Sequence, residues 1–453
     1  MYSVRSVVNA FDPRLPGRFA LRGATLTSIG DPFADGSGET LRYEADGLVV
    51  VDGGVIESAG AAASLMDALP AGTPVETLPP HTLLVPGFVD CHVHFAQLGV
   101  IASHGTQLVD WLERYTFPSE QAMADAGVVR AAAASFFDQA LACGTTTPVS
   151  FCTTHAISVD AFFEEALARG VRAIGGKVLM DRNAPAALLD TAQRGYDESK
   201  ALIARWHGRD RLGYAITPRF APTSSPGQLE AAGALWREFP RCWVQSHVAE
   251  NVREVEWVRS LFPEARDYVD VYARFGLLGR RAIHGHGIHL QERELRALAE
   301  SGTAIAHCPG SNLFLGSGLF AWQGVKDPSR PIDVGLGSDV GGGLSLSMLA
   351  AAADAYKVAQ LGGFTLTPAQ AFDLITRGGA QALGLDERIG SLAPGREADL
   401  VILDLEATPA LAQRTREAGD IDEVLFAVLM LGDDRAVKAT YVGGRCVHRR
   451  GAE

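Results

Sequence analysis

Two histidines stand one residue apart at the end of an apolar run. The segment TLLVPGFVDCHVHFAQ (82–97) has the character of a buried strand, and it ends in His92 and His94. Because side chains alternate along a strand, both imidazoles project to one side, about 6 to 7 Å apart, which is close enough to bind one ion. Histidines at the end of a core strand can equally be polar residues satisfied by their neighbours. The doublet alone leaves both interpretations open.

Further histidines and an acid end other predicted strands. His247 is followed three residues later by Glu250, the next strand carries His284 and His286, and the last strand ends in Asp339. Imidazole nitrogens and a carboxylate oxygen are ligands that Zn²⁺ accepts, and a catalytic site keeps one position open for water. The chain has only 12 histidines, so their convergence on strand ends predicts a metal site. Neither an HExxH helix nor an HxE…PCxxC pattern occurs.

The elements that must position these residues follow a regular alternation. Between residues 85 and 390, β-branched apolar runs alternate with Ala/Leu/Glu/Arg-rich stretches of helical spacing, which predicts a closed (β/α)8 barrel of the TIM type. Thr367 and Pro368 are expected to cap and begin one of the helices. Residues 1–84 and 391–453 are expected to be strands that pair into a small β-sandwich. The predicted barrel strands are 83–95, 144–151, 171–180, 212–220, 242–250, 281–288, 303–312 and 332–341.

Composition excludes several classes of partner. The 453 residues have a net charge of −13, so a basic surface for nucleic acid is not expected, and the substrate should be a small molecule. No apolar stretch has the length of a membrane span or a signal peptide, which predicts no membrane contact and a cytoplasmic protein. Six cysteines lack the spacing of a disulfide framework or a zinc module, and each is expected to be a small buried hydrophobe. They are Cys91, Cys143, Cys152, Cys242, Cys308 and Cys446.

These motifs carry a family resemblance. The set PGFVDCHVHFAQ, QSHVAEN, HGHGIHL, AHCPGSNLFLGSG and GLGSDVGGG resembles the amidohydrolase superfamily, and WLERYTFPSE, GKVLMDRNAP and PRF are similar to segments of its guanine deaminases. The resemblance implies a barrel flanked by a β-sandwich built from both termini, one zinc ion per chain and a homodimer. It also implies hydrolysis of a C–N bond of a cyclic amidine, converting guanine to xanthine and ammonia.

The resemblance also assigns roles, residue by residue. His286, rather than His284, matches the superfamily's strand-six histidine, since it lies 21 residues before His307, and it would hydrogen-bond the attacking water or the oxyanion formed from it. Glu250 would be the proton shuttle. The implied zinc ligands are His92, His94, His247 and Asp339, and the implied lining of the base pocket is Gln97, Arg219 and Phe220.

The chemistry favours the same residue types. Displacing an amine from a purine requires a strong nucleophile, which zinc supplies by lowering the pKa of water. Asp339 can take the first proton, and Glu250 must protonate ring atom N3 and later the departing amine. A bland alternative makes Glu250 a solvated acid at a helix N-terminus. Arg219 could likewise pair with a carboxylate, such as a barrel Asp, and never meet substrate.

Other functions stay open on the sequence. Binuclear relatives use a modified Lys on strand four, but LGYAITPRF has none, so Lys177 on strand three is interpreted as structural or pocket-lining and a single metal is expected. A deaminase of 8-oxoguanine, another aminopurine or a pterin, or a triazine hydrolase, would share the ligands and differ in the pocket. A scaffold protein that has lost catalysis would be expected to lack ligands, and here none is missing.

Overall fold

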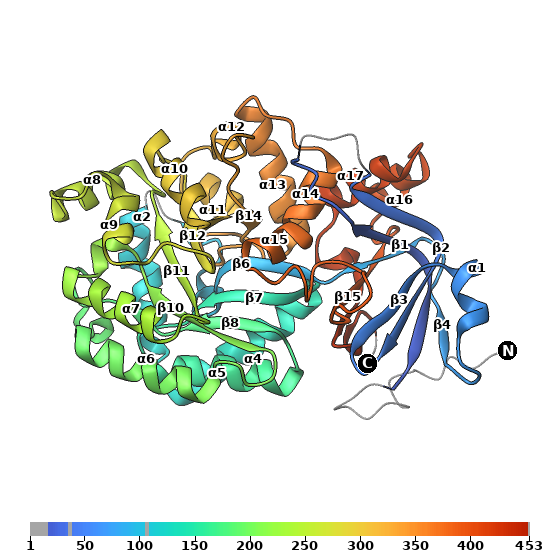
Figure 1. Cartoon of the computed structure of the whole chain (residues 1–453), viewed down its shortest axis with the longest axis horizontal. Helices are drawn as coiled ribbons and strands as arrows, with labels where there is room; N and C mark the ends of the chain where they lie inside the picture. The colour runs from blue at the N-terminus through green and yellow to red at the C-terminus, as the bar shows by residue number, and fades with distance from the viewer. Residues whose placement is uncertain (1–16, 35–38, 105–107, 452–453) are drawn as a thin grey trace.

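The computed structural model describes residues 17–34, 39–104 and 108–451. Most of the N-terminal stretch, for which no signal peptide is expected, lies outside these residues. A helical barrel unit and a β-rich unit lie side by side, and both ends of the described chain belong to the β-rich unit (Figure 1). Within the described ranges, no helix combines the length and apolar character needed to cross a membrane.

Eight parallel strands form the barrel and confirm the predicted fold. The first predicted strand divides at Gly87 into a strand of the small sheet and a barrel strand. The barrel closes where Asp339 N–H donates to His92 O at 2.8 Å and His94 N–H donates to Val340 O at 3.0 Å. In sheet order the strands are β14 (Val334–Leu336), β13 (Ala304–His307), β12 (Ala282–His286), β11 (Trp243–Val248), β10 (Leu212–Pro218), β8 (Ala173–Gly176), β7 (Thr145–Phe151) and β6 (Phe88–His94), and β9 (Val178–Leu179) pairs with β10.

Helices follow the barrel strands and cover the outside of the sheet (Figure 1). Thr367 caps α14 by accepting from Gln370 N–H, with Pro368 as the first helical residue, as predicted. The α-helices of this unit are α2 (Leu108–Trp111), α3 (Phe117–Ala122), α4 (Ala126–Ala142), α5 (Ala156–Arg169), α6 (Ala192–Trp206), α7 (Pro226–Glu238), α8 (Val252–Leu261), α9 (Tyr268–Arg274), α10 (Glu292–Ser301), α11 (Pro309–Phe314), α12 (Trp322–Val325), α13 (Met348–Leu361), α14 (Pro368–Leu374) and α15 (Arg377–Ala382). Shorter helical turns are η3 (Phe95–Val100), the π-helix η4 (Leu112–Thr116), η5 (Ala186–Leu188) and η6 (Ala221–Thr223).

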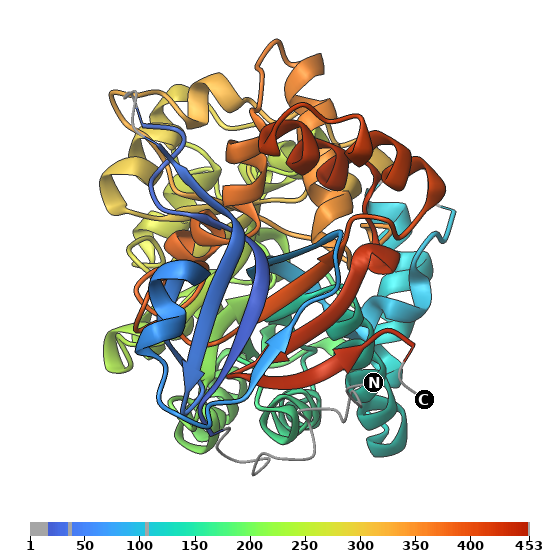
Figure 2. The same cartoon turned by 90° about the vertical axis from the view of Figure 1, so that its right-hand side faces the viewer.

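The second unit is a sheet built from both termini, as expected, and Figure 2 shows N-terminal and C-terminal strands lying side by side in it. Its hydrogen bonds join all eight strands into one sheet. Within it, β5 pairs with β15 and with β1, which joins the two ends of the chain. In sheet order the strands are β17 (Arg445–Arg449), β16 (Val437–Val442), β15 (Leu400–Asp404), β5 (Thr82–Pro86), β1 (Phe19–Ser28), β2 (Leu41–Asp52) and β3 (Val55–Ala61), and β4 (Val75–Thr77) pairs with β1.

One part of the tail was predicted wrongly. The sequence after residue 390 was assigned to strands, but α16 (Pro409–Arg416) and α17 (Ile421–Leu431) lie between β15 and β16. Their start signals are present: Thr408 caps α16 before a proline, and Asp420 caps α17. The helix α17 packs on α13 and α14, so tertiary contact with the barrel stabilises it. The other short helices of this unit are α1 (Ala62–Leu65), η2 (Met66–Ala68) and η7 (Asp434–Ala436).

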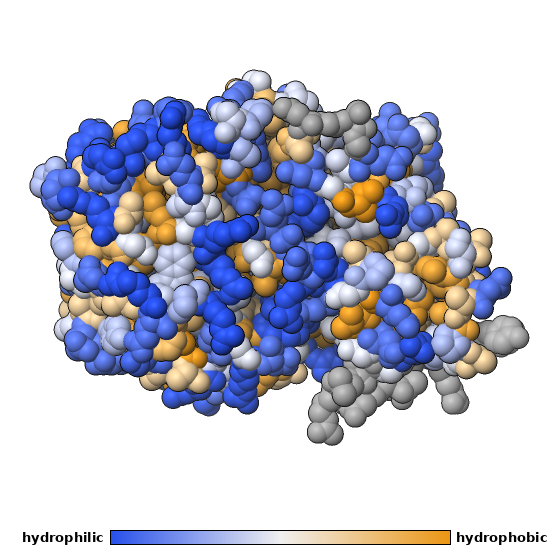
Figure 3. All heavy atoms as spheres, viewed as in Figure 1, coloured by the Kyte–Doolittle hydropathy of each residue, from blue (hydrophilic) through white to orange (hydrophobic). Residues whose placement is uncertain are grey.

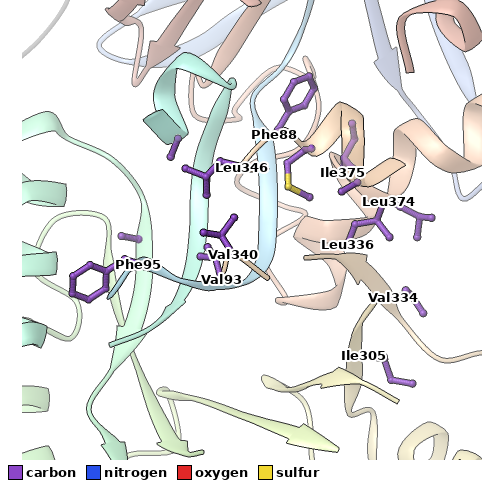
Figure 4. Close-up of a cluster of buried hydrophobic side chains, with 14 of the residues drawn as sticks. Phe88, Val93, Phe95, Ile305, Val334, Leu336, Val340, Leu346, Leu374 and Ile375 are labelled. Carbon is purple, nitrogen blue, oxygen red and sulfur yellow. The ribbon is translucent and has the colours of Figure 1, made fainter. Parts of the chain in front are cut away.

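The main core lies between the barrel sheet and its helices. Figure 4 shows Val93 and Phe88 of β6 near Leu336 of β14 and the end of α14. These side chains are fully buried, so they fix the position of the strands whose ends carry the polar residues. On the face drawn in Figure 3, hydrophilic residues dominate and hydrophobic ones are scattered in small groups.

Candidate active site

The four predicted metal ligands meet at the carboxyl end of the barrel strands. His92 and His94 belong to the end of β6, His247 to the end of β11, and Asp339 follows β14. All four residues are buried, and one donor atom from each lies within 4.8 Å of the others. The Nε2 atoms of His94 and His247 are 3.2 Å apart, and Asp339 Oδ1 lies 3.4 Å from Nε2 of His92 and of His94.

The protonation of this cluster fits a divalent cation. Nδ1 of His247 lies 2.6 Å from the carbonyl oxygen of Arg219, so Nδ1 carries the proton. The lone pair of its Nε2 then points into the cluster, toward Nε2 of His94. Nε2 of His92 is buried with no hydrogen-bond partner among the described residues. Burial holds the pKa of His94 and of His247 well below the ordinary value, so both rings stay neutral.

The fourth ligand adds the negative charge. Burial alone would raise the pKa of Asp339, but the close approach of His92, His286 and His94 outweighs burial and leaves the pKa lowered. Neutral imidazoles around a carboxylate, in a buried pocket, are a donor set that zinc accepts. The chemistry of the donors therefore fits the metal that the sequence predicts.

Local features of β6 aim its histidines into the pocket. Val89 and Cys91 belong to the core inside the barrel, whereas Val93 packs outside it, and the pairing with β7 is irregular between Asp90 and Val93. Such an irregularity changes which face of the sheet a side chain occupies. Alternation places His92 and His94 on one side of the strand, and the irregularity turns that side toward the pocket.

Glycines make room for the first of these rings. A Cβ on Gly285 would lie 2.6 Å from Cε1 of His92, and one on Gly337 would lie 2.7 Å from its Cβ. The backbones of β12 and of the segment after β14 therefore approach the ring closely. His286 and Asp339 themselves have φ of 73° and 47°, a left-handed conformation that is strained for these residue types.

Glu250 and His286 form a second polar group beside the ligands. Glu250 Oε2 lies 3.4 Å from Nε2 of His286, which is 3.8 Å from Asp339 Oδ2, and Ser317 Oγ donates to Glu250 Oε1 at 3.2 Å. His286 Nδ1 lies 2.9 Å from Asn312 Oδ1, so Nδ1 is the donor. Burial alone would lower the pKa of His286, but Glu250 and Asp339 leave it raised.

The environment of Glu250 suits proton transfer. Its residue is only 4% exposed, and α8 begins beyond it at Val252 with Asn251 as cap. The alternative of a solvated acid at the helix N-terminus is therefore wrong. Burial raises the pKa of Glu250 to about 7, with smaller contributions from nearby carboxylates. A carboxyl with that pKa can both hold and release a proton near neutral pH.

The residues expected to contact the base line the same pocket. Gln97 lies in η3, and Arg219 and Phe220 follow β10 directly. They face the ligands across a space bounded by apolar side chains from α2, the π-helix η4 and the loop after α11. The lining residues are His94, Gln97, Leu108, Trp111, Leu112, Arg219, Phe220, His247, Glu250, His286, Ser311, Leu315, Asp339 and Gly342.

Arg219 both pairs with an acid and lines this pocket. Its Nη1 donates to Oε1 and Oε2 of Glu120 at 2.6 and 2.8 Å. The carboxylate that the alternative interpretation anticipated is thus a glutamate of α3 rather than a barrel Asp. Pairing does not remove Arg219 from the pocket, so the two interpretations of this residue both describe part of its environment.

Several residues of the site were not identified from the sequence. Glu120, Trp111, Asn312 and Ser317 lie inside the segments WLERYTFPSE and AHCPGSNLFLGSG, whose similarity to the family was noted without a role for these positions. Glu120 contacts Gln97 and Arg219 from 23 and 99 residues away. Only the segment-level resemblance could have indicated them.

Three other predicted positions have structural surroundings. Lys177 is fully buried, donates to Thr154 O and pairs with Asp190 Oδ2 at 2.6 Å, outside the residues that line the pocket. His284 stacks on Tyr272 with 4.9 Å between ring centroids, and burial lowers its pKa to about 4. Cys308 lies close to His92, His286 and Asp339, but burial raises the pKa of its thiol well above the ordinary value, which disfavours metal binding.

Comparison with known proteins gives consistent matches. The model of the amidohydrolase family matches residues 83–447. The chain is 45% identical to the guanine deaminase of Escherichia coli (strain K12) over 414 residues, covering 90% of this chain and 93% of the relative. A solved structure of Escherichia coli guanine deaminase has a TM-score of 0.93 at 43% identity, with 96% of this chain and 100% of the other covered. The guanine deaminase of C. acetobutylicum, solved with guanine in its active site, has a TM-score of 0.85 at 27% identity, covering 95% and 100%.

Proposed function

The chain belongs to the amidohydrolase family, within its guanine deaminase branch, and from this premise we propose that it hydrolyses guanine to xanthine and ammonia. One observation carries the proposal beyond likeness. A single buried pocket holds a metal-ligand cluster and Glu250 at one end and the donors of Arg219 and Gln97 at the other. Hydrolysis of an exocyclic C–N bond needs both a nucleophile with a proton carrier and a means of orienting the ring.

The metal cluster provides the nucleophile. We propose that zinc is the ion and that His92, His94, His247 and Asp339 hold it, since three neutral imidazoles and one carboxylate suit that metal. When bound, zinc lowers the pKa of water toward neutrality and so supplies a nucleophile. The carboxylate of Asp339 takes a proton from the attacking water, and Nε2 of His286, 3.8 Å from that carboxylate, hydrogen-bonds the oxygen.

Glu250 carries protons between water and ring. Addition of water oxygen at C2 places negative charge on N3, which the carboxyl of Glu250 protonates. The carboxylate of Glu250 then accepts the proton of the new C2 hydroxyl and delivers it to the amine, so the C2–N bond breaks, the C2 carbonyl forms and ammonia leaves. The proton that Asp339 took from water returns to Glu250 and restores the starting state. Its pKa of about 7 suits both steps, and proton transfer by a positioned group typically contributes about 10² to 10⁴-fold to the rate.

Arg219 selects the base. A guanidinium has only donors, so directed at position 6 it favours the carbonyl oxygen of guanine over the amino group of adenine. Gln97 donates to the same region, Phe220 supplies an aromatic face, and the apolar walls from α2 and η4 exclude water from the reacting atoms.

Two properties extend the proposal beyond the site. The family resemblance supports a homodimer. The acidic composition and the absence of a membrane-spanning helix among the described residues support a location in the cytoplasm, with guanine rather than nucleic acid or membrane as the partner.

Ammonia release decides the substrate. Purified protein is assayed with guanine, 8-oxoguanine, adenine and pterins at matched concentrations. We expect guanine to have the highest kcat/KM and adenine to give negligible turnover. Preference for a pterin or for 8-oxoguanine would assign a different ring to the same machinery.

A further inference from the structure

We propose that Glu120 is a positioning residue that makes the pocket select a neutral purine over an anionic one. The inference rests on the proposed function, because it concerns how that substrate is read. Nothing about the metal cluster is required for it. Glu120 lies on α3, and the sequence motifs assign it no role.

Glu120 connects the two residues expected to read the base. Its side chain is buried, with 1% of the residue exposed, and it accepts three hydrogen bonds: Gln97 Nε2 at 2.9 Å and Arg219 Nη1 at 2.6 and 2.8 Å. Charge-assisted hydrogen bonds of this kind are the strongest in proteins, and burial increases the cost of breaking them. Both readers are therefore anchored to one carboxylate.

The anchoring also orients each reader. Because Gln97 Nε2 donates to Glu120, its Oε1 is directed to Gly341 N–H at 3.3 Å, which fixes the amide against rotation by 180°. Glu120 engages Nη1 of Arg219 alone, so the remaining donors of the guanidinium stay available to a ligand. Phe117, also on α3, lies 5.7 Å below the guanidinium and limits its movement.

Charge balance gives the pair its selectivity. The Arg219 side chain is 4% exposed, so an unpaired guanidinium would place a full positive charge in a poorly solvated pocket. The carboxylate of Glu120 cancels that charge at contact distance. The reading end of the pocket thus offers donors without net charge, which suits neutral guanine and disfavours an anion.

The product provides the contrasting ligand. Xanthine loses a proton near neutral pH and becomes an anion, whereas guanine remains neutral there. With Glu120 in place, the xanthine anion meets no net positive charge at this end of the pocket. Replacing Glu120 by a neutral residue should uncover the charge of Arg219 and strengthen binding of the anion.

The test compares Glu120→Gln, Glu120→Asp and Glu113→Gln. Glu113 is exposed on the adjoining π-helix, so Glu113→Gln removes the same charge without touching the pocket. In Glu120→Gln we expect kcat/KM for guanine to fall about 10²-fold, mainly through KM, because misplaced readers weaken orientation of the base. Xanthine inhibition on the alkaline side of neutrality should tighten about tenfold or more. Glu120→Asp keeps the charge and loses reach, so KM should rise without a gain in xanthine inhibition.

The outcomes separate this inference from the proposed function. Failure of the wild-type protein to deaminate guanine would refute the function whatever Glu120 does. If the wild type is active and Glu120→Gln binds xanthine no more tightly, the charge role of Glu120 is wrong. If Glu120→Gln does not fold, Glu120→Asp decides, and an unchanged KM in that variant overturns the positioning role. Glu113→Gln should match the wild type in every measurement.

Discussion

Replacing Glu250 by Gln should separate catalysis from metal binding and from stability. The amide keeps the shape of the side chain but cannot carry a proton, so kcat should fall about 10²-fold or more while metal content stays at the wild-type level. Ser317 can still donate to the amide oxygen, so the hydrogen bond that holds this side chain survives the change.

The same substitution should stabilise the metal-free protein. Burial raises the pKa of Glu250 from 4.5 to about 7, so the folded state binds its proton more tightly than the unfolded state. Stability due to this group is fully present below about pH 4.5 and is lost as pH rises through about 7. The loss above pH 7 amounts to about 3 kcal/mol, which Glu250→Gln should recover. Near pH 4 the carboxyl of Glu250 is mostly protonated in both the folded and the unfolded wild type. The wild type and Glu250→Gln should therefore be equally stable at that pH.

The wild type and Glu250→Gln are treated with chelator and unfolded in urea at about pH 4 and above pH 7. Guanine turnover is measured separately on the metal-loaded proteins. Glu256→Gln is the matched control, since Glu256 is exposed on α8, the helix that begins just beyond Glu250. A variant that loses its metal would make Glu250 part of the coordination or of its support. Equal stability of variant and wild type above pH 7 would show that burial does not hold the proton on Glu250, and the argument for its role as acid would fail.

Three further perturbations test other parts of the site. Metal analysis should find about one zinc per chain, with activity lost on chelation and restored by zinc; two equivalents, both needed for activity, would contradict the mononuclear site. Arg219→Ala should lower kcat/KM for guanine more than Gln97→Ala does, with metal retained, and an unchanged preference for 6-carbonyl over 6-amino inhibitors would show that Arg219 is not the reader. Lys177→Met leaves the buried Asp190 paired only with the largely exposed Arg194 and should lower the free energy of unfolding by about 3 to 5 kcal/mol in urea titration at wild-type metal content, whereas loss of metal would return Lys177 to the site.

The sequence predicted the elements with regular periodicity. All eight barrel strands were found because buried parallel strands are continuous apolar runs, and residue type and spacing marked the histidines at their ends as candidate ligands, which the structure brings close together. The wrong part was the tail, where α17 is an apolar run, LFAVLML, between strand segments. Its helical state depends on packing against α13 and α14, and local sequence does not specify such contacts.

The residues missed in the site were missed for a related reason. Glu120 acquires a role only when α3 is placed against the end of β10, where Arg219 lies 99 residues away in sequence. A glutamate in a helix otherwise has the pattern of a solvated charge. The irregular pairing in β6 was equally invisible, although it turns the shared side of His92 and His94 toward the pocket.

Burial is the common cause of the properties that the proposed chemistry needs. It lowers the pKa of His94 and His247, which keeps them as neutral ligands, and it raises the pKa of Glu250 to about 7, where it can exchange protons. Each effect is unfavourable for the folded protein by itself, since a buried group held away from its preferred charge state reduces stability. A bound cation would offset part of that penalty by satisfying the lone pairs of the histidines and the charge of Asp339. Metal affinity and folding stability should therefore be coupled in this protein, and the catalytic end of the barrel is where that coupling should be largest.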